Sequence, residues 1–130
     1  MTALQAAALY TALNLFLLVF LAYRVASRRQ ASKIGLGHGD NEELHRAVRV
    51  HGNAAEWLPG ALLGLLLLAL LDAPVLLIHA LGVFLILGRG LHAYGLSASP
   101  GTTRGRVAGA AITLLIYVIE GAALFWFALR

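Results

Sequence analysis

The sequence of 130 residues contains no cysteine. This absence excludes disulfide bridges and metal centres with thiolate ligands. Any thiol chemistry at this protein therefore depends on a thiol that a ligand brings. The first residues also lack the basic segment and the small-residue cleavage site of a secretory signal peptide, so we expect the first apolar run to remain as a membrane span.

Charged residues are scarce as well, at 12% of the chain, whereas 60% of the residues are hydrophobic. A soluble domain has about 25% charged and about 45–50% apolar residues. The composition therefore indicates an integral membrane protein, and we expect a single domain, residues 1–130, because one span takes about 20 residues. The net charge of +4 comes mainly from arginines at the ends of apolar runs, which is a signal of topology and not of nucleic-acid binding.

Four apolar runs predict four membrane spans, at about residues 4–25, 42–71, 75–96 and 106–129. Because the connections between them are short, the predicted fold is all-α, an integral membrane four-helix bundle that runs up-down-up-down. Gly60 and Gly64 are four residues apart, as are Gly105 and Gly109, and small residues at this spacing allow close packing within a bundle or an oligomer. Asn14, inside the first span, is expected to form a hydrogen bond between helices.

The distribution of cations predicts the orientation. Lysines and arginines flank the first and third connections, whereas the second connection has none. Cytoplasmic loops carry the excess of cations, so both termini are expected outside, which in a bacterium is the periplasm. The polar residues discussed next then lie on the cytoplasmic side.

The most informative segment is the start of the second span, NEELHRAVRVHGNAAEWLP. In a helix, Glu42, Arg46, Arg49, Asn53 and Glu56 recur at steps of four and three and share one face. Polar groups at membrane depth are costly unless they are paired or face an interior filled with water or ligand. We therefore expect this face to bind a ligand, within one polar belt at the cytoplasmic ends of all four helices. The belt comprises Arg28, Arg29, Arg46, Arg49, His51, Asn53, Glu56, Arg89, His92, Tyr94, Arg104 and Arg106.

This belt favours a small anionic ligand that also carries an amino group. Arginine binds carboxylates bidentately, and Glu56 can bind an ammonium group. A cation beside a bound thiol lowers the thiol pKa from roughly 8.5 and increases its thiolate fraction. Two structural alternatives stay open: the outer arginines can contact lipid phosphates, and Glu56 can neutralise Arg49 or Arg89. We expect His38 and His45 to be solvated.

The segment RAVRVHGNAAEWLP resembles the second-helix signature of the MAPEG family, the membrane-associated proteins in eicosanoid and glutathione metabolism. The residues of that signature are here Arg49, Asn53, Glu56, Trp57 and Pro59. GRGLHAYGLS resembles the end of the family's third helix, with Arg89 and His92 at matching spacing. The two motifs together are most similar to the small prokaryotic inner-membrane branch.

The resemblance implies a homotrimer that holds glutathione between adjacent subunits near the cytoplasmic side, and no metal. It implies that glutathione contacts Arg28, Arg49, Asn53, Glu56, Trp57, Arg89, His92 and Tyr94, and that Arg104 or Arg106 stabilises the thiolate. The activity so implied is that of a glutathione transferase or peroxidase, acting on a lipophilic electrophile or hydroperoxide that arrives from the bilayer.

Two departures from the family's pattern bear on that activity. Gly52 stands where some members have arginine, and Tyr94 alone represents the third-helix tyrosines. A non-enzymatic lipid-binding or scaffold protein of the same fold is therefore the alternative. A small four-span drug exporter would need an acid in the first span, and residues 4–25 contain none.

Overall fold

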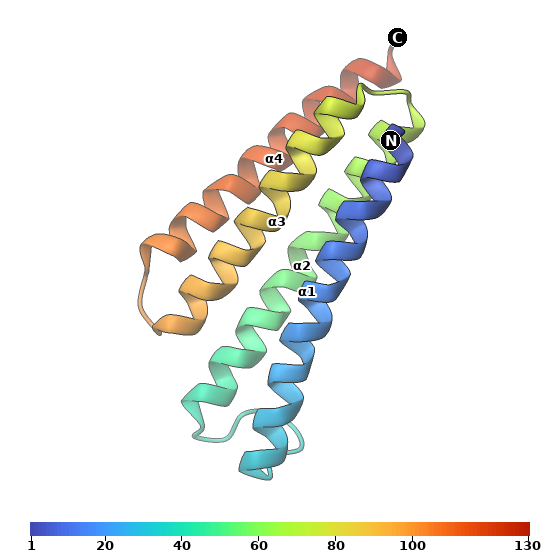
Figure 1. Cartoon of the computed structure of the whole chain (residues 1–130). Coiled ribbons are helices and arrows are strands. Elements are labelled where there is room, and N and C mark those ends of the chain that lie inside the picture. Colours follow the sequence, from blue (N-terminus) through green and yellow to red (C-terminus); the bar gives the residue numbers. More distant parts are fainter.

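The computed structural model describes residues 1–130 and consists of four α-helices. They are α1 (Ala3–Ser32), α2 (Glu42–Leu70), α3 (Val75–Ala98) and α4 (Arg104–Ala128). All four are long and apolar enough to cross a membrane. Both termini and the α2–α3 connection lie at one end of the bundle, and the other two connections lie at the opposite end (Figure 1). The predicted all-α fold with four candidate spans is confirmed.

Helix α1 continues to Ser32, well past the predicted end of the first span at residue 25. The segment after residue 25 contains no glycine or proline before Gly35, so nothing in it breaks a helix. Lys33 ends the helix in the left-handed conformation, with φ of 56°. Arg28 and Arg29 are therefore fixed on the last turns of α1 and do not belong to a flexible loop.

Side-chain caps set the first residues of α2 and α4. The Asn41 side chain accepts a hydrogen bond from the backbone N–H of Leu44 at 2.9 Å. The Thr103 hydroxyl accepts one from the backbone N–H of Arg106 at 3.2 Å, so α4 begins at Arg104, two residues before the predicted start. Both Arg104 and Arg106 lie in the first turn of α4 as a result.

Helices α2 and α3 form the centre of the bundle. They contact each other, and each of them also packs against both α1 and α4, whereas α1 and α4 do not contact each other. Leu58 and Leu65 of α2 and Leu85 of α3 are fully buried in the apolar core. The polar ends of α1 and α4 consequently lie on different sides of the central pair.

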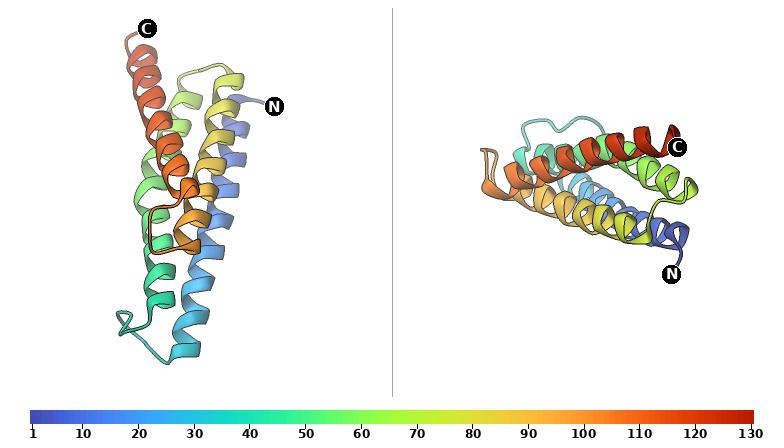
Figure 2. Two further views of the ribbon diagram at one scale, coloured as in Figure 1. Left: turned by 90° about the vertical axis from the view of Figure 1, so that its left-hand side faces the viewer. Right: turned by 90° about the horizontal axis from the view of Figure 1, so that it is seen from above.

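The four helices differ in length. With 30 and 29 residues, α1 and α2 extend for about 45 Å, whereas α3 and α4, with 24 and 25 residues, extend for about 37 Å. The hydrocarbon layer of a bilayer is about 30 Å thick. Figure 2 shows that the α1–α2 connection projects well beyond the α3–α4 connection. The first turns of α2 therefore extend beyond the end of the α3–α4 pair.

Helices α3 and α4 approach each other through glycines. A β-carbon at Gly109 would lie 2.5 Å from the carbonyl oxygen of Gly88 and would collide with the backbone of His92. A β-carbon at Gly95 would collide with the backbone of α4 at Gly105. The close helix approach predicted from the Gly105–Gly109 spacing is therefore present, and it holds His92 directly against α4.

The hydrogen bond of Asn14 differs from expectation. The Asn14 side-chain amide donates to the carbonyl of Tyr10 in its own helix at 2.8 Å, so the predicted bond between helices is wrong. The side chain is short enough to reach back one turn, which satisfies its donor locally. Helix α2 continues through Pro59 without interruption.

Tyr10 supplies the polar contact between α1 and α3, because its hydroxyl lies 2.8 Å from Nδ1 of His79. We expect Tyr10→Phe to lower the free energy of unfolding by about 0.5–1.5 kcal/mol, the usual contribution of one hydrogen bond. Thermal unfolding in detergent micelles measures this. Tyr23→Phe is the control, since Tyr23 is 69% exposed and makes no hydrogen bond. Equal melting points for the two variants would contradict the prediction.

Candidate functional site

A polar cavity of about 300 Å³ opens between α2, α3 and α4 at the end that carries the α1–α2 and α3–α4 connections. We call it the outer pocket. Its lining residues are Glu42, His45, Arg46, Arg49, Asn53, His92, Leu96, Pro100 and Arg106. Four of these belong to the face of the second helix that the steps of four and three predict. The helix periodicity therefore identified one wall of the pocket.

A second cavity of about 140 Å³ lies deeper between the same three helices. We call it the inner chamber. Its lining residues are Asn53, Trp57, Arg89, His92, Ala110, Thr113 and Leu114. Asn53 and His92 line both cavities, so these two side chains stand at the boundary between the outer pocket and the inner chamber.

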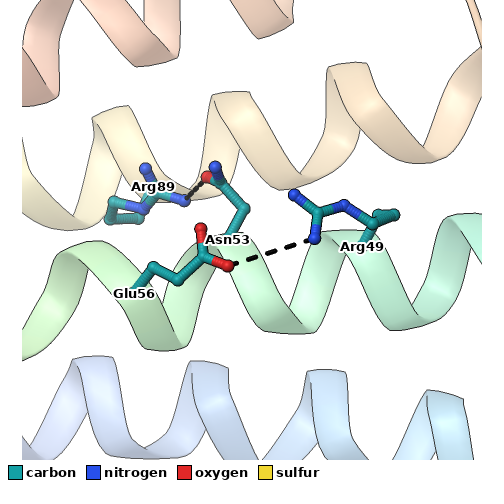
Figure 3. Close-up of polar contacts among 4 residues, drawn as sticks. All are labelled: Arg49, Asn53, Glu56 and Arg89. Carbon is teal, nitrogen blue, oxygen red and sulfur yellow. Dashed lines mark hydrogen bonds and ion pairs between the residues drawn. The ribbon is translucent and has the colours of Figure 1, made fainter.

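Two polar contacts connect the predicted ligand-binding residues (Figure 3). Arg89 donates from Nη2 to Oδ1 of Asn53 at 2.6 Å, across the α2–α3 interface. Arg49 and Glu56, two turns apart on α2, form an ion pair at 4.0 Å. Their side chains are 56% and 57% exposed, and such exposed pairs contribute only about 0–1 kcal/mol. Both charges therefore remain available to a ligand at little cost.

Arg89 has an unusual environment for a charged side chain. It is 1% exposed, and its only hydrogen bond is the one to Asn53. Its Nε is buried without a partner, and no carboxylate lies within 4.0 Å of it. His92, 6% exposed, likewise has a buried Nδ1 without a partner. The inner chamber thus contains a positive charge with no anion from the protein to compensate it.

Trp57 is held in place by α4. Its ring packs edge-to-face against Tyr117, with ring centroids 5.4 Å apart. The Tyr117 hydroxyl also donates a hydrogen bond to the backbone carbonyl of Trp57. These two contacts fix the indole ring as one wall of the inner chamber.

The structure separates the two candidate arginines of the fourth helix. Arg106 lines the outer pocket, whereas Arg104 is exposed and lines neither the outer pocket nor the inner chamber. Residues two positions apart on an α-helix point about 200° apart around its axis, so only one of them can face α2 and α3. Within one chain, Arg106 is the arginine of this pair that faces the pocket.

Within one chain, the residues of the predicted belt do not line one common cavity. Arg28 lines a separate polar cavity of about 120 Å³ between α1, α2 and α3, together with Arg24, Glu43, Arg46, Ala47 and Ser97. Tyr94 is 75% exposed on the outer surface of α3. Because α1 and α4 do not touch, the polar residues divide into two groups, and only Arg46 lines a cavity in both.

Some residues of the outer pocket were not expected there. His45 was predicted to be solvated, but it lines the pocket and stacks on His38, with ring centroids 4.2 Å apart. It lies four residues before Arg49, and this spacing alone would have placed it on the same face. Leu96 and Pro100 carry no comparable sequence signal, since their position depends on where α3 ends.

Comparison with known proteins identifies similar sequences. The sequence model described as "MAPEG family" matches residues 7–126. The inner membrane protein YecN of Escherichia coli strain K12 is 35% identical over 88 residues, which cover 68% of this chain and 67% of that protein. YecN of Escherichia coli O6:H1 is similar to the same extent.

Proposed function

Because this chain belongs to the MAPEG family, which includes glutathione transferases, we propose that it is a membrane glutathione transferase or peroxidase. In this proposal it lies in the bacterial inner membrane, as the name of YecN states for that protein, with both termini in the periplasm. Glutathione binds on the cytoplasmic side as a co-substrate, and a lipophilic second substrate arrives from the bilayer.

The observation that carries this proposal is the composition of the outer pocket. Three guanidinium groups, from Arg46, Arg49 and Arg106, converge on one cavity with the Asn53 amide. Guanidinium groups bind carboxylates bidentately, and glutathione carries two carboxylates. Glu42 in the wall, or Glu56, which pairs with the pocket residue Arg49, can bind the single ammonium group of glutathione.

The proposed chemistry uses the thiolate form of glutathione. The excess of positive charge in the pocket favours loss of the thiol proton to water. The sulfur then attacks an electrophilic carbon and displaces a leaving group such as halide. With a hydroperoxide, sulfur attacks the outer oxygen and releases an alcohol, and a second glutathione converts the sulfenic acid to the disulfide and water. Arg106 is the fourth-helix arginine that we assign to the pocket.

The proposal includes a homotrimer with glutathione between adjacent subunits. Arg28 and Tyr94 lie outside the outer pocket of their own chain. In a trimer, these two residues could therefore contact only a glutathione molecule that is bound in the outer pocket of a neighbouring subunit. Tyr94, which is 75% exposed on α3, supports such contacts with another chain.

A thermal-shift titration with glutathione tests the proposal. A ligand present at 100 times its dissociation constant stabilises the folded state by about 2.7 kcal/mol. We expect glutathione to raise the melting point of the purified protein and to be consumed with an aryl halide as electrophile. Arg49→Ala should lose most of this stabilisation, because it removes one carboxylate contact of roughly 1.5–3 kcal/mol.

Arg130→Ala is the matched control for charge, since Arg130 lies at the opposite end of the bundle and lines none of these cavities. It should respond to glutathione as the wild type does. A wild-type protein that neither melts higher with glutathione nor consumes it would support the non-enzymatic scaffold alternative instead.

A further inference from the structure

The cavity between α1, α2 and α3 has no ligand in the proposed function. We call it the α1 pocket, and its lining residues are Arg24, Arg28, Glu43, Arg46, Ala47 and Ser97. Three positive charges stand there against one negative charge, a formal net charge of +2. The only ion pair within 4.0 Å in the chain is Arg49–Glu56, so no carboxylate pairs with an arginine of this pocket. The α1 pocket therefore has an excess of positive charge that the protein does not neutralise.

The hydrogen bonds of the α1 pocket leave a buried donor without an acceptor. Arg24 donates from Nη1 to the Ser97 hydroxyl at 2.9 Å, and that hydroxyl donates to the carbonyl of Ala93 at 2.7 Å. These two bonds hold the Arg24 guanidinium group against α3. Nε of Arg28, by contrast, is buried and has no partner. A buried donor without an acceptor is costly, so the pocket favours a ligand that supplies acceptor atoms.

The size and shape of the α1 pocket favour a phosphate group. Its volume of about 120 Å³ corresponds to roughly four water molecules at about 30 Å³ each, so it can hold a phosphate group but not a peptide. Arg24 and Arg28 belong to α1, whereas Arg46 belongs to α2. The two oxygens of a carboxylate lie in one plane, but the oxygens of a phosphate are tetrahedral and can accept from both helices at once. Guanidinium groups bind phosphate bidentately, and basic pockets between membrane helices bind lipid headgroups.

The position of the α1 pocket along the bundle places it at the level of lipid headgroups. Helices α1 and α3 both start at the end that carries the termini (Figure 1). Arg24 lies 21 residues after Ala3 of α1, and Ser97 lies 22 residues after Val75 of α3. At about 1.5 Å per residue, these distances are about 32 and 33 Å, and the hydrocarbon layer is about 30 Å thick. The pocket therefore lies where the hydrocarbon layer ends and the phosphates of the lipids begin.

We propose that the α1 pocket binds the phosphate group of an anionic phospholipid, whose acyl chains lie along the outer face of α1. The Arg24 guanidinium group lies over the Phe20 ring, 5.9 Å from its centroid, so Arg24 connects the pocket with the outer surface. Phe16 and Phe20 are exposed one turn apart and offer an apolar surface to the acyl chains. Because α1 packs only against α2 and α3, a headgroup between these three helices stabilises the position of α1.

A titration with short-chain lipids tests the proposal. The probe is dioctanoyl phosphatidylglycerol, added to delipidated protein in micelles of a neutral detergent. Dioctanoyl phosphatidylcholine has a phosphate but no net charge, and inorganic phosphate has no acyl chains. We expect phosphatidylglycerol alone to raise the melting point saturably, with one molecule per chain in native mass spectra. A saturable effect of inorganic phosphate at the same concentration would assign the pocket to phosphate from solution and would overturn lipid as its source.

Two arginine variants distinguish the pocket from a general attraction to lipid. Arg28→Gln removes a charge from the pocket, whereas Arg104→Gln removes an exposed charge that lines none of the three polar cavities at the same end of the bundle. We expect Arg28→Gln to weaken phosphatidylglycerol binding about tenfold, the effect of one lost charge-assisted hydrogen bond. Arg104→Gln should bind within about a factor of two of wild type. Arg24→Gln should show the same tenfold loss, and it replaces Arg28→Gln if that variant does not fold.

Two further results would overturn the proposal. Equal losses for Arg28→Gln and Arg104→Gln would show that exposed arginines attract lipid phosphates wherever they lie. Displacement of phosphatidylglycerol by glutathione would show that the α1 pocket belongs to a glutathione site. An unchanged apparent dissociation constant of the lipid in the presence of glutathione supports a separate site. Lipid binding does not depend on glutathione transfer, so either proposal can fail without the other.

Discussion

Replacing Arg106 by alanine is expected to lower kcat/KM for glutathione-dependent conjugation by about 10- to 100-fold. The Arg106 side chain lines the outer pocket, where it faces the predicted ligand-binding side of α2. A hydrogen bond from a charged donor to a ligand contributes roughly 1.5–3 kcal/mol, and each 1.4 kcal/mol corresponds to about a factor of ten. Steady-state rates with an aryl halide and varied glutathione measure the loss.

Arg104→Ala is the matched comparison, because Arg104 lies two positions away on the same turn of α4 and is exposed. It removes the same charge from nearly the same place in the sequence, but not from the pocket. We expect its kcat/KM to stay within about a factor of two of wild type, as for most surface substitutions. A larger loss for Arg104→Ala than for Arg106→Ala would reverse the assignment of the two residues.

The second large effect is expected at Gly109. A β-carbon there would lie 2.5 Å from the carbonyl oxygen of Gly88 and against the backbone of His92, and neither backbone can move without separating α3 from α4. We expect Gly109→Ala to lower the free energy of unfolding by about 3 kcal/mol, at the upper end for overpacking. It should also weaken glutathione binding, since His92 lines both cavities.

Gly121→Ala is the control on the same helix, because a β-carbon at Gly121 meets no atom within 4 Å. Alanine in the middle of a helix is favoured over glycine by roughly 0.5–1 kcal/mol, so this variant should be as stable as wild type or slightly more so. Thermal unfolding in detergent, with and without glutathione, measures both effects. The close-contact explanation fails if Gly109→Ala melts at the wild-type temperature.

The four helices could be predicted because each apolar run is long and bounded by polar residues or turn formers. The second helix was predicted most accurately, since Asn41 caps its start and a turn follows its end. The end of the first helix was placed too early. The sequence changes from apolar to polar near residue 25. The helical conformation does not depend on hydrophobicity, so the helix continues to Ser32.

The candidate site could be predicted along one helix but not across helices. Periodicity placed Arg49 and Asn53 on one face, and both line the outer pocket. The pairing of Asn53 with Arg89 depends on how α2 and α3 pack, and no spacing within either helix reveals it. Similarly, Arg28 was grouped with Arg106 by membrane depth alone. In the structure, Arg28 and Arg106 line different cavities, because α1 and α4 are not in contact.

Because the two helix pairs differ in length, the opening of the outer pocket is asymmetric. The first turns of α2 form a wall on one side and extend beyond the other side, which is formed by the ends of α3 and α4 and by Pro100 in their connection. A molecule from the surrounding water can therefore arrive across that connection and lie along α2. Such an approach suits an extended peptide better than a compact one, because the rising wall offers contacts along several helical turns.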